Sequence, residues 1–354
     1  MIRDIRNNPD FLAALLHGRR SHMAERERLE ALCRIRTIRQ FESEISPGSQ
    51  TDSIRKIQQR LAQDLAREIT RIAARLVPTD ADLIRWLAVR FQVENLKVLL
   101  RSLLTGIRPA AMLPHLLPLP RELAWNVETV ETTQSMEDLA HLLPQGPMRK
   151  SWVEAVAVYE GENRPFFFEA ALDRAYFREL LARTEALTGD DRDLARPLVL
   201  QEIDTYHLML VARGVFIHRL EAKILLPLHV TGTGISHERF TAMLTDPDLR
   251  AAAGRALGRA LDTLPAAPTE ASEPAMPVDP AGLEALAWNR FLRLANRAFR
   301  RSHMGFAAVV AFVALRRVEI ANLITLSEGI RVQLPEEQNR ARMIPRRNLE
   351  AAHV

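Results

Sequence analysis

The amino-acid sequence predicts an all-helical protein made of three similar segments, and three observations support this prediction. Only 14 of the 354 residues are glycine, whereas Ala, Leu, Arg and Glu, which favour helix, are abundant. Apolar residues recur at spacings of three and four, as they do along one face of a helix. One pattern of apolar and polar positions also appears three times, about 110 residues apart.

The helical spacing is clearest in five segments, which we expect to be helices: 54–76, 82–104, 172–187, 194–213 and 306–326. A short extended segment around 165–168 is the one candidate departure from helix. Residues 304–315 form the longest uncharged apolar stretch. Because about 20 residues are needed to span a bilayer, this stretch predicts a buried core helix.

Composition narrows the class of protein. With 47% apolar and 26% charged residues, the chain is expected to be globular, neither disordered nor embedded in a membrane. Residues 1–10 alternate charged and polar side chains and lack the pattern of a secretory signal. The one cysteine, Cys33, excludes an internal disulfide and fits a reducing cytosol.

The positive charge is modest and unevenly placed. The net charge is +4, with the excess in residues 1–110 and a negative balance in residues 111–225. No basic run is interleaved with aromatic residues, so we expect no nucleic-acid binding. An enzyme or nucleic-acid binder that uses the basic N-terminal third remains an alternative, for which the test residues would be Arg19, Arg20, Arg34 and Arg36.

The repeated pattern is anchored on Asn95, His207 and Asn322, which we call the anchor residues. In each copy a polar residue stands three positions before the anchor and a leucine directly follows it. Arginine stands six positions after the first two anchors. The candidate residues of this repeated structural motif are Gln92, Asn95, Leu96, Arg101, Asp204, His207, Leu208, Arg213, Glu319, Asn322 and Leu323.

On a helix, the anchor and the polar residue three positions before it share one otherwise apolar face. An unsatisfied buried polar group costs about 1–3 kcal/mol, so we expect a fixed inter-helix hydrogen bond in each copy. The alternative is half of a catalytic or metal site. Gln92 cannot act as a base, and a site repeated three times would need Gln, Asp and Glu to be interchangeable, so the structural role is favoured.

No other segment of the sequence contains a recognisable catalytic or ligand-binding motif. The sequence lacks a phosphate-binding loop, zinc-ligand spacing and any set of nucleophile, base and oxyanion donors. We therefore expect no catalytic residue, no cofactor and no metal. Asp173 could be a site acid, but a helix-surface or capping role is favoured.

The repeat predicts three helical domains, 1–110, 111–225 and 226–354. A stretch with five prolines, 264–282, predicts a surface loop or linker inserted in the third domain. Solenoids of helix pairs have periods of about 30–50 residues, so the much longer period here argues against that architecture.

Four segments contain short motifs that lie in order along the chain. Residues 93–101 contain an NLK-x-x-L-R motif, and residues 168–177 contain an E-x-x-L-D-x-x-Y motif through Glu169, Asp173 and Tyr176. Residues 202–213 contain an acidic residue three positions before His207, and residues 317–323 contain an E-x-x-N-L motif. Together these four segments resemble those of a family of V/A-type (vacuolar/archaeal-type) ATPase components, the C subunits, whose eukaryotic members are the d subunits. The likeness runs from about residue 80 to residue 340. It departs from the family at His207, where asparagine is usual, at residues 1–60, which match loosely, and at the proline-rich stretch.

The resemblance implies a funnel of three similar helical domains around a pseudo-threefold axis. It implies a non-catalytic central-rotor adaptor that joins the membrane proteolipid ring to the central stalk and transmits torque for ATP-coupled H⁺ or Na⁺ transport. The implied partners are the proteolipid ring and the shaft subunits, with no nucleic acid and no small-molecule substrate. The implied location is cytoplasmic, peripheral on the cytoplasmic face of the membrane. The alternative is a generic helical scaffold unrelated to ATPases.

Overall fold

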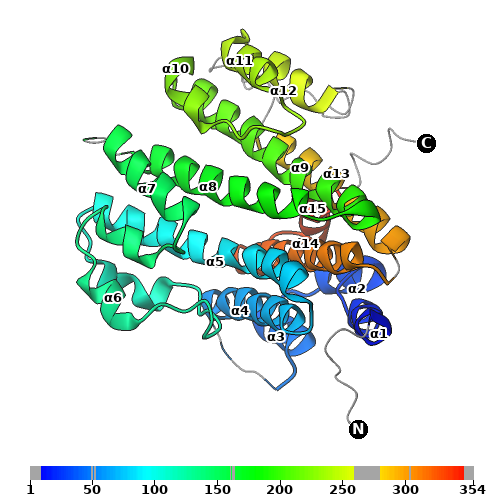
Figure 1. The fold of residues 1–354 in the computed structure, drawn as a ribbon. Coiled ribbons are helices and arrows are strands. Elements are labelled where there is room, and N and C mark those ends of the chain that lie inside the picture. The colour runs from blue at the N-terminus through cyan, green and yellow to red at the C-terminus, as the bar shows by residue number, and fades with distance from the viewer. Residues whose placement is uncertain are drawn as a thin grey trace, which may run out of the picture. The chain divides into compact units, whose positions relative to one another are not determined.

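Every regular element that the structure describes is a helix, which confirms the predicted all-helical fold (Figure 1). The structure is a computed structural model and describes residues 9–48, 51, 53–159, 161, 164–258, 280–302 and 304–346. No helix in these ranges is long and apolar enough to cross a membrane. The chain divides into two compact units, residues 1–8 with 59–188 (unit 1) and residues 9–58 with 189–354 (unit 2). The threefold division of the sequence stays a prediction.

Unit 1 is built around two long helices, α5 and α8, and α7 packs on α8. Its elements are most of α4 (Ile54–Ala73), then α5 (Pro78–Leu104), η1 (Pro109–His115), α6 (Val127–Thr132), η2 (Asp138–Leu142), α7 (Pro147–Val158) and α8 (Pro165–Glu185). The extended segment expected at 165–168 is wrong, because Pro165 is the first residue of α8. Proline is favoured at this position, where its missing N–H breaks no helical hydrogen bond.

Unit 2 is built around α9, α13 and α14, which pack against one another. Its elements are α1 (Pro9–Ser21), α2 (Arg26–Cys33), α3 (Ile38–Ile45), the start of α4, α9 (Gly189–Val211), η3 (Ala212–Ile217), α10 (Ala222–Leu225), η4 (Leu226–Leu228), α11 (His237–Thr245), α12 (Leu249–Leu257), α13 (Pro280–Ser302), α14 (Phe306–Arg331) and α15 (Glu336–Arg342).

Helix α14 forms the centre of the unit 2 core. Every residue from 306 to 315 is buried, which confirms the buried core helix expected at 304–315 from Phe306 onward. The side chain of Asp191 in α9 accepts a hydrogen bond of 2.8 Å from the Ala307 N–H, so α9 caps the first turn of α14. Of the proline-rich stretch, residues 264–279 lie outside the described residues, and its last three residues belong to the first turn of α13.

Candidate functional site: polar anchors on three long helices

Asn95 in α5 and Asn322 in α14 make the same pair of hydrogen bonds. The Asn95 side chain donates to the Leu117 carbonyl at 2.9 Å and accepts from the Leu117 N–H at 2.7 Å. The Asn322 side chain donates to the Ile344 carbonyl at 2.8 Å and accepts from the Ile344 N–H at 2.7 Å. Both bonded residues lie 22 positions after the anchor, and both anchors are 3% exposed. In both copies a buried amide therefore holds the segment that follows the helix, which we call the returning chain, against that helix through the same pair of hydrogen bonds.

The bonding partner differs from the one that the sequence predicted. We expected inter-helix hydrogen bonds, but Leu117, Val230 and Ile344 all lie in non-helical segments. The reason is that helical backbone groups already bond one another, whereas irregular backbone needs outside partners when it is buried. An asparagine side chain carries one donor group and one acceptor and can satisfy both backbone groups of one residue.

His207 in α9 holds the equivalent place with a different side chain. Its Nε2 accepts a hydrogen bond of 2.9 Å from the Val230 N–H, 23 positions later. Burial, followed by the proximity of His229, lowers the pKa of His207 to about 3, so the ring is neutral near pH 7. Histidine in place of asparagine therefore keeps a side-chain acceptor for the backbone N–H, but it lacks the second hydrogen bond that asparagine donates to the backbone carbonyl.

The polar residues three positions before the anchors also bind irregular backbone. Gln92 donates to the Leu123 carbonyl at 2.7 Å, and Asp204 accepts from the Ile235 N–H at 3.1 Å, each 31 positions later. Glu319 instead accepts from the Ala24 N–H, in the segment before α2. Burial raises the pKa of Asp204 despite the hydrogen bonds from Ile235 and Gly234, which act in the opposite direction. The first two copies thus share a second hydrogen bond to the segment that follows the anchor helix. In the third copy the equivalent residue binds the segment before α2 instead.

The end of each anchor helix is capped at the position seven residues after the anchor. A carbonyl there accepts a hydrogen bond from an N–H five or six residues further on, a pattern that closes helix C-termini. The three bonds, of 2.8, 2.9 and 2.8 Å, join Ile107 to Ser102, Leu220 to Gly214 and Leu334 to Gly329. At Gly329 an added Cβ would have to displace the buried Asn339 side chain.

Between the anchor and its bonded backbone residue the second copy contains one extra residue, and a π-helical turn absorbs it. The anchor-to-backbone spacing is 23 in this copy and 22 in the other two. Helix α9 continues into η3, a π-helix in which the His218 N–H donates to the Arg213 carbonyl five residues earlier. A π-turn holds one residue more than an α-turn over the same length. The same return geometry is therefore kept despite the insertion.

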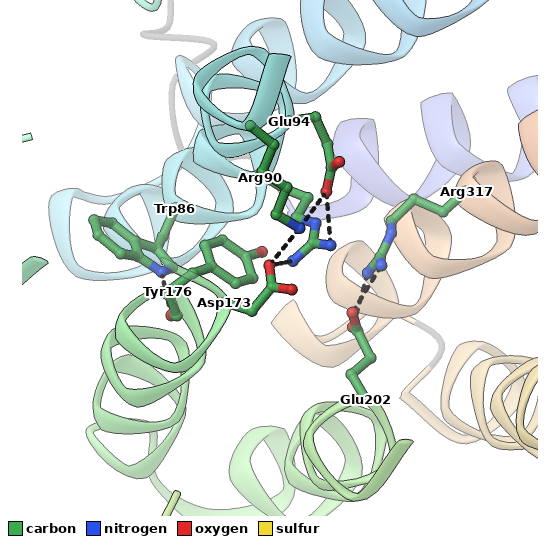
Figure 2. A network of polar contacts seen from close by, with 8 residues as sticks. Trp86, Arg90, Glu94, Asp173, Tyr176, Glu202 and Arg317 are labelled. Carbon is green, nitrogen blue, oxygen red and sulfur yellow. Dashed lines mark hydrogen bonds and ion pairs between the residues drawn. The ribbon is translucent and has the colours of Figure 1, made fainter. Parts of the chain in front are cut away.

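Asp173 lies at the centre of a partly buried ion-pair network in unit 1 (Figure 2). Its carboxylate is 2.8 Å from Arg90 and 2.7 Å from Lys97, and Glu94 contacts both cations. Burial raises the pKa of Asp173, but the charges and hydrogen bonds of Arg90 and Lys97 outweigh it and hold the pKa below its ordinary value. The expected helix-surface or capping role of Asp173 is therefore wrong, because the sequence did not reveal the cations that face it.

The other residues of the 168–177 segment also join α8 to α5. Glu169 accepts a 2.6 Å hydrogen bond from Arg101, so two predicted residues meet. The Tyr176 ring stacks on Trp86 with ring centres 6.0 Å apart, and the Trp86 indole donates to the Tyr176 carbonyl. Leu96, Leu208 and Leu323 are buried, while Arg213 is exposed.

A charged position five residues before each anchor, occupied by Arg90, Glu202 and Arg317, was not predicted from the sequence. In unit 2 the last two form a two-point ion pair between α9 and α14, with both N–O distances 2.7 Å (Figure 2). The sequence did contain a signal for these residues, because the same position is charged in all three copies, although the sign of the charge differs. Asn289 in α13 was missed as well, and its side chain accepts from the Arg346 N–H at 3.0 Å.

A double-mutant cycle on Glu202→Gln and Arg317→Met should give a coupling energy of about 1–2 kcal/mol, because both side chains are largely buried and meet at two points. Urea denaturation of the four proteins measures it. The exposed pair of Lys223 and Glu221 is the control and should couple much more weakly, because water screens an exposed ion pair. Equal coupling in both cycles would contradict the structural role.

Two comparisons with known proteins are informative. The sequence matches a family model described as ATP synthase (C/AC39) subunit over residues 12–342, from within α1 to the end of α15. It is also similar to the C subunit of the A-type ATP synthase of Methanocaldococcus jannaschii, with 23% identity over 155 residues. That alignment covers 44% of this chain and 35% of the relative, so less than half of the relative's length is matched.

Proposed function

Because the chain belongs to the ATP synthase (C/AC39) subunit family, we propose that it is the central-rotor adaptor of a V/A-type ATPase. The members of this family are accessory subunits of the synthase and not the catalytic ones. In the proposed role the chain joins the membrane proteolipid ring to the central stalk and transmits torque for ATP-coupled H⁺ or Na⁺ transport. It would lie on the cytoplasmic face of the membrane, as a peripheral protein.

The observation that carries the proposal is the fastening of the chain to all three anchor helices. An adaptor that transmits torque must resist bending, and the segments that leave a helix are ordinarily its most mobile neighbours. Here Asn95, His207 and Asn322 tie those segments back to their helices with buried hydrogen bonds. Close-packed interiors transmit strain, so a chain fastened in this way suits a mechanical coupling.

Family membership also argues against one of the alternatives that the sequence left open. A scaffold unrelated to ATPases is no longer supported, since the match to an ATP synthase subunit family covers nearly the whole chain. The specific partners and the transported ion remain part of the proposal.

The test is to delete the chain from its native host and to purify an affinity-tagged copy from membranes. The tagged copy should bring down a proteolipid and a shaft subunit. Membranes from the deletion strain should lose ATP-driven ion transport, because torque no longer reaches the ring. The control is ATP hydrolysis by the detached catalytic sector, which should continue. Full ion transport without the chain would rule the proposal out.

A further inference from the structure

The second copy of the repeat holds its returning segment with side chains that can titrate, whereas the first copy uses amides. Residues 117 and 123 in unit 1 are bound by Asn95 and Gln92. Residues 230 and 235 in unit 2 are bound by His207 and Asp204. Amides keep the same charge across the physiological pH range, but imidazole and carboxyl groups do not.

The bond made by His207 excludes a second proton on its ring. Its Nε2 accepts the Val230 N–H, so the neutral ring carries its proton on Nδ1. A second proton must bind Nε2, and that nitrogen then becomes a donor facing another donor. Protonation of His207 and its bond to Val230 are therefore mutually exclusive.

The surroundings of His207 disfavour an imidazolium. The His229 ring lies nearly parallel to it, with ring centres 4.6 Å apart, and Phe240 lies 5.2 Å away. His229 donates from Nε2 to the Ile235 carbonyl, and the exposed His237 meets His229 at 5.5 Å. A charge on one stacked imidazole would thus repel a charge on the other.

No carboxylate among the described residues around the ring is placed to balance such a charge. On α9, Asp204 already accepts from the Ile235 N–H, and Tyr206 donates to the Leu228 carbonyl. On α11 and α13, Arg239 and Arg290 act on Asp204. Asp246, the residue that follows α11, is paired with Arg255 of α12. Burial raises the pKa of Asp204, so by linkage its protonation does not drive opening, and the acid response is assigned to His207 alone.

We propose that residues 230–235 form an acid-released latch, closed while His207 and Asp204 hold Val230 and Ile235 and opened when His207 binds a second proton. Opening frees the segment that leads into α11 and α12, which pack on each other and on α9 (Figure 1). The equivalent segment 117–123 stays closed because its amides do not titrate.

The size of the effect follows from His207. Its pKa is lowered to about 3 in the folded protein and returns to 6.5 when the ring reaches water. The latch is therefore fully stable above pH 6.5 and loses stability as the pH falls below that value. Linkage gives an opening constant about 30-fold larger at pH 5 than at pH 8.

Hydrogen exchange followed by mass spectrometry tests the latch in the wild-type protein at pH 8, 6.5 and 5, with exposure times scaled for the chemical exchange rate. Peptides covering 225–245 should lose about 30-fold protection between pH 8 and 5. Peptides covering 113–124 should not change. His207→Asn, which installs the amide of the other copies, should remove the pH dependence, whereas His237→Gln at the exposed ring should preserve it.

Two results would overturn the proposal. One is an equal pH response of the 225–245 and 113–124 peptides in the wild-type protein, a comparison that stands even if a variant does not fold. The other is a His207→Asn protein that folds and still loses protection at pH 5, because the acid sensitivity would then have another source.

Discussion

Replacing Asp173 with alanine is expected to lower the free energy of unfolding by about 2–3 kcal/mol, since it leaves Arg90 and the buried Lys97 with only the more exposed Glu94 as counter-charge. The Lys97 side chain is only 8% exposed and cannot reach water without disturbing the contact between α5 and α8. Removal of one partner from such a network costs more than the pair itself contributes. Urea denaturation followed by tryptophan fluorescence measures the loss, because Trp86 and Trp152 both lie in unit 1.

The matched control is Asp82→Ala, which removes a carboxylate of the same α5–α8 helix pair. Asp82 is 58% exposed and pairs with Arg183, so its loss should cost less than about 1 kcal/mol. Acid gives a second check. The pKa of Asp173 is held below its ordinary value of 3.8, so its stabilisation is present above that pH and is lost as the pH falls further. Equal losses for Asp173→Ala and Asp82→Ala would contradict the central role of Asp173.

The long helices could be predicted because their signal is local. Apolar spacing alone located the segments that became α4, α5, α8, α9 and α14. The anchors were visible for a related reason, since Asn95 and Asn322 stand on faces that are otherwise apolar. The spacing of apolar residues does not indicate which path the chain takes after each helix. The bonded residues, Leu117 and Ile344, lie in irregular segments without periodicity, so the partners of the anchors were predicted wrongly.

The ion pairs were hidden for a different reason. Lys97 and Asp173 are far apart in the sequence, and their meeting depends on how α5 packs against α8. A charged residue on a helix is ordinarily solvated, so nothing local distinguished Asp173 from a surface acid. The repetition did contain a usable signal. Arg90, Glu202 and Arg317 stand at one position of the three copies, and each makes an ion pair.

Residues 173–176 (Asp-Arg-Ala-Tyr) and residues 296–299 (Asn-Arg-Ala-Phe) are similar in sequence, and the structure gives this similarity a physical basis. In unit 1, Arg90 bonds Asp173 and lies over the Tyr176 ring, 5.6 Å from its centre. In unit 2, Arg20 bonds Asn296 and lies over the Phe299 ring, 4.7 Å from its centre. A guanidinium is thus held by a polar side chain and by an aromatic ring three residues later in both units. Sequence repetition here marks a repeated contact and not merely a repeated helix.

Asn322→Ala is expected to lower the free energy of unfolding of unit 2 by about 2–4 kcal/mol, because it leaves both backbone groups of Ile344 without their side-chain partner in a buried site. The loss should be local at first. Asn289 still holds the Arg346 N–H, so the segment 344–346 keeps one of its two attachments. Hydrogen exchange of peptides ending at residue 346 should therefore rise in Asn322→Ala and rise further when Asn289→Ala is added.

Asn95→Ala provides the matched comparison, because Asn95 makes the same two bonds to Leu117 in unit 1. It should cost a similar amount and raise exchange in peptides around residue 117, leaving those around residue 344 unchanged. Asn322→Asp should be intermediate at pH 7, since it keeps the acceptor for the Ile344 N–H and loses the donor. The prediction would be wrong if Asn322→Ala and Asn95→Ala each lowered the free energy of unfolding by less than about 0.5 kcal/mol. The buried amides would then not be the groups that hold the returning chain to its helices.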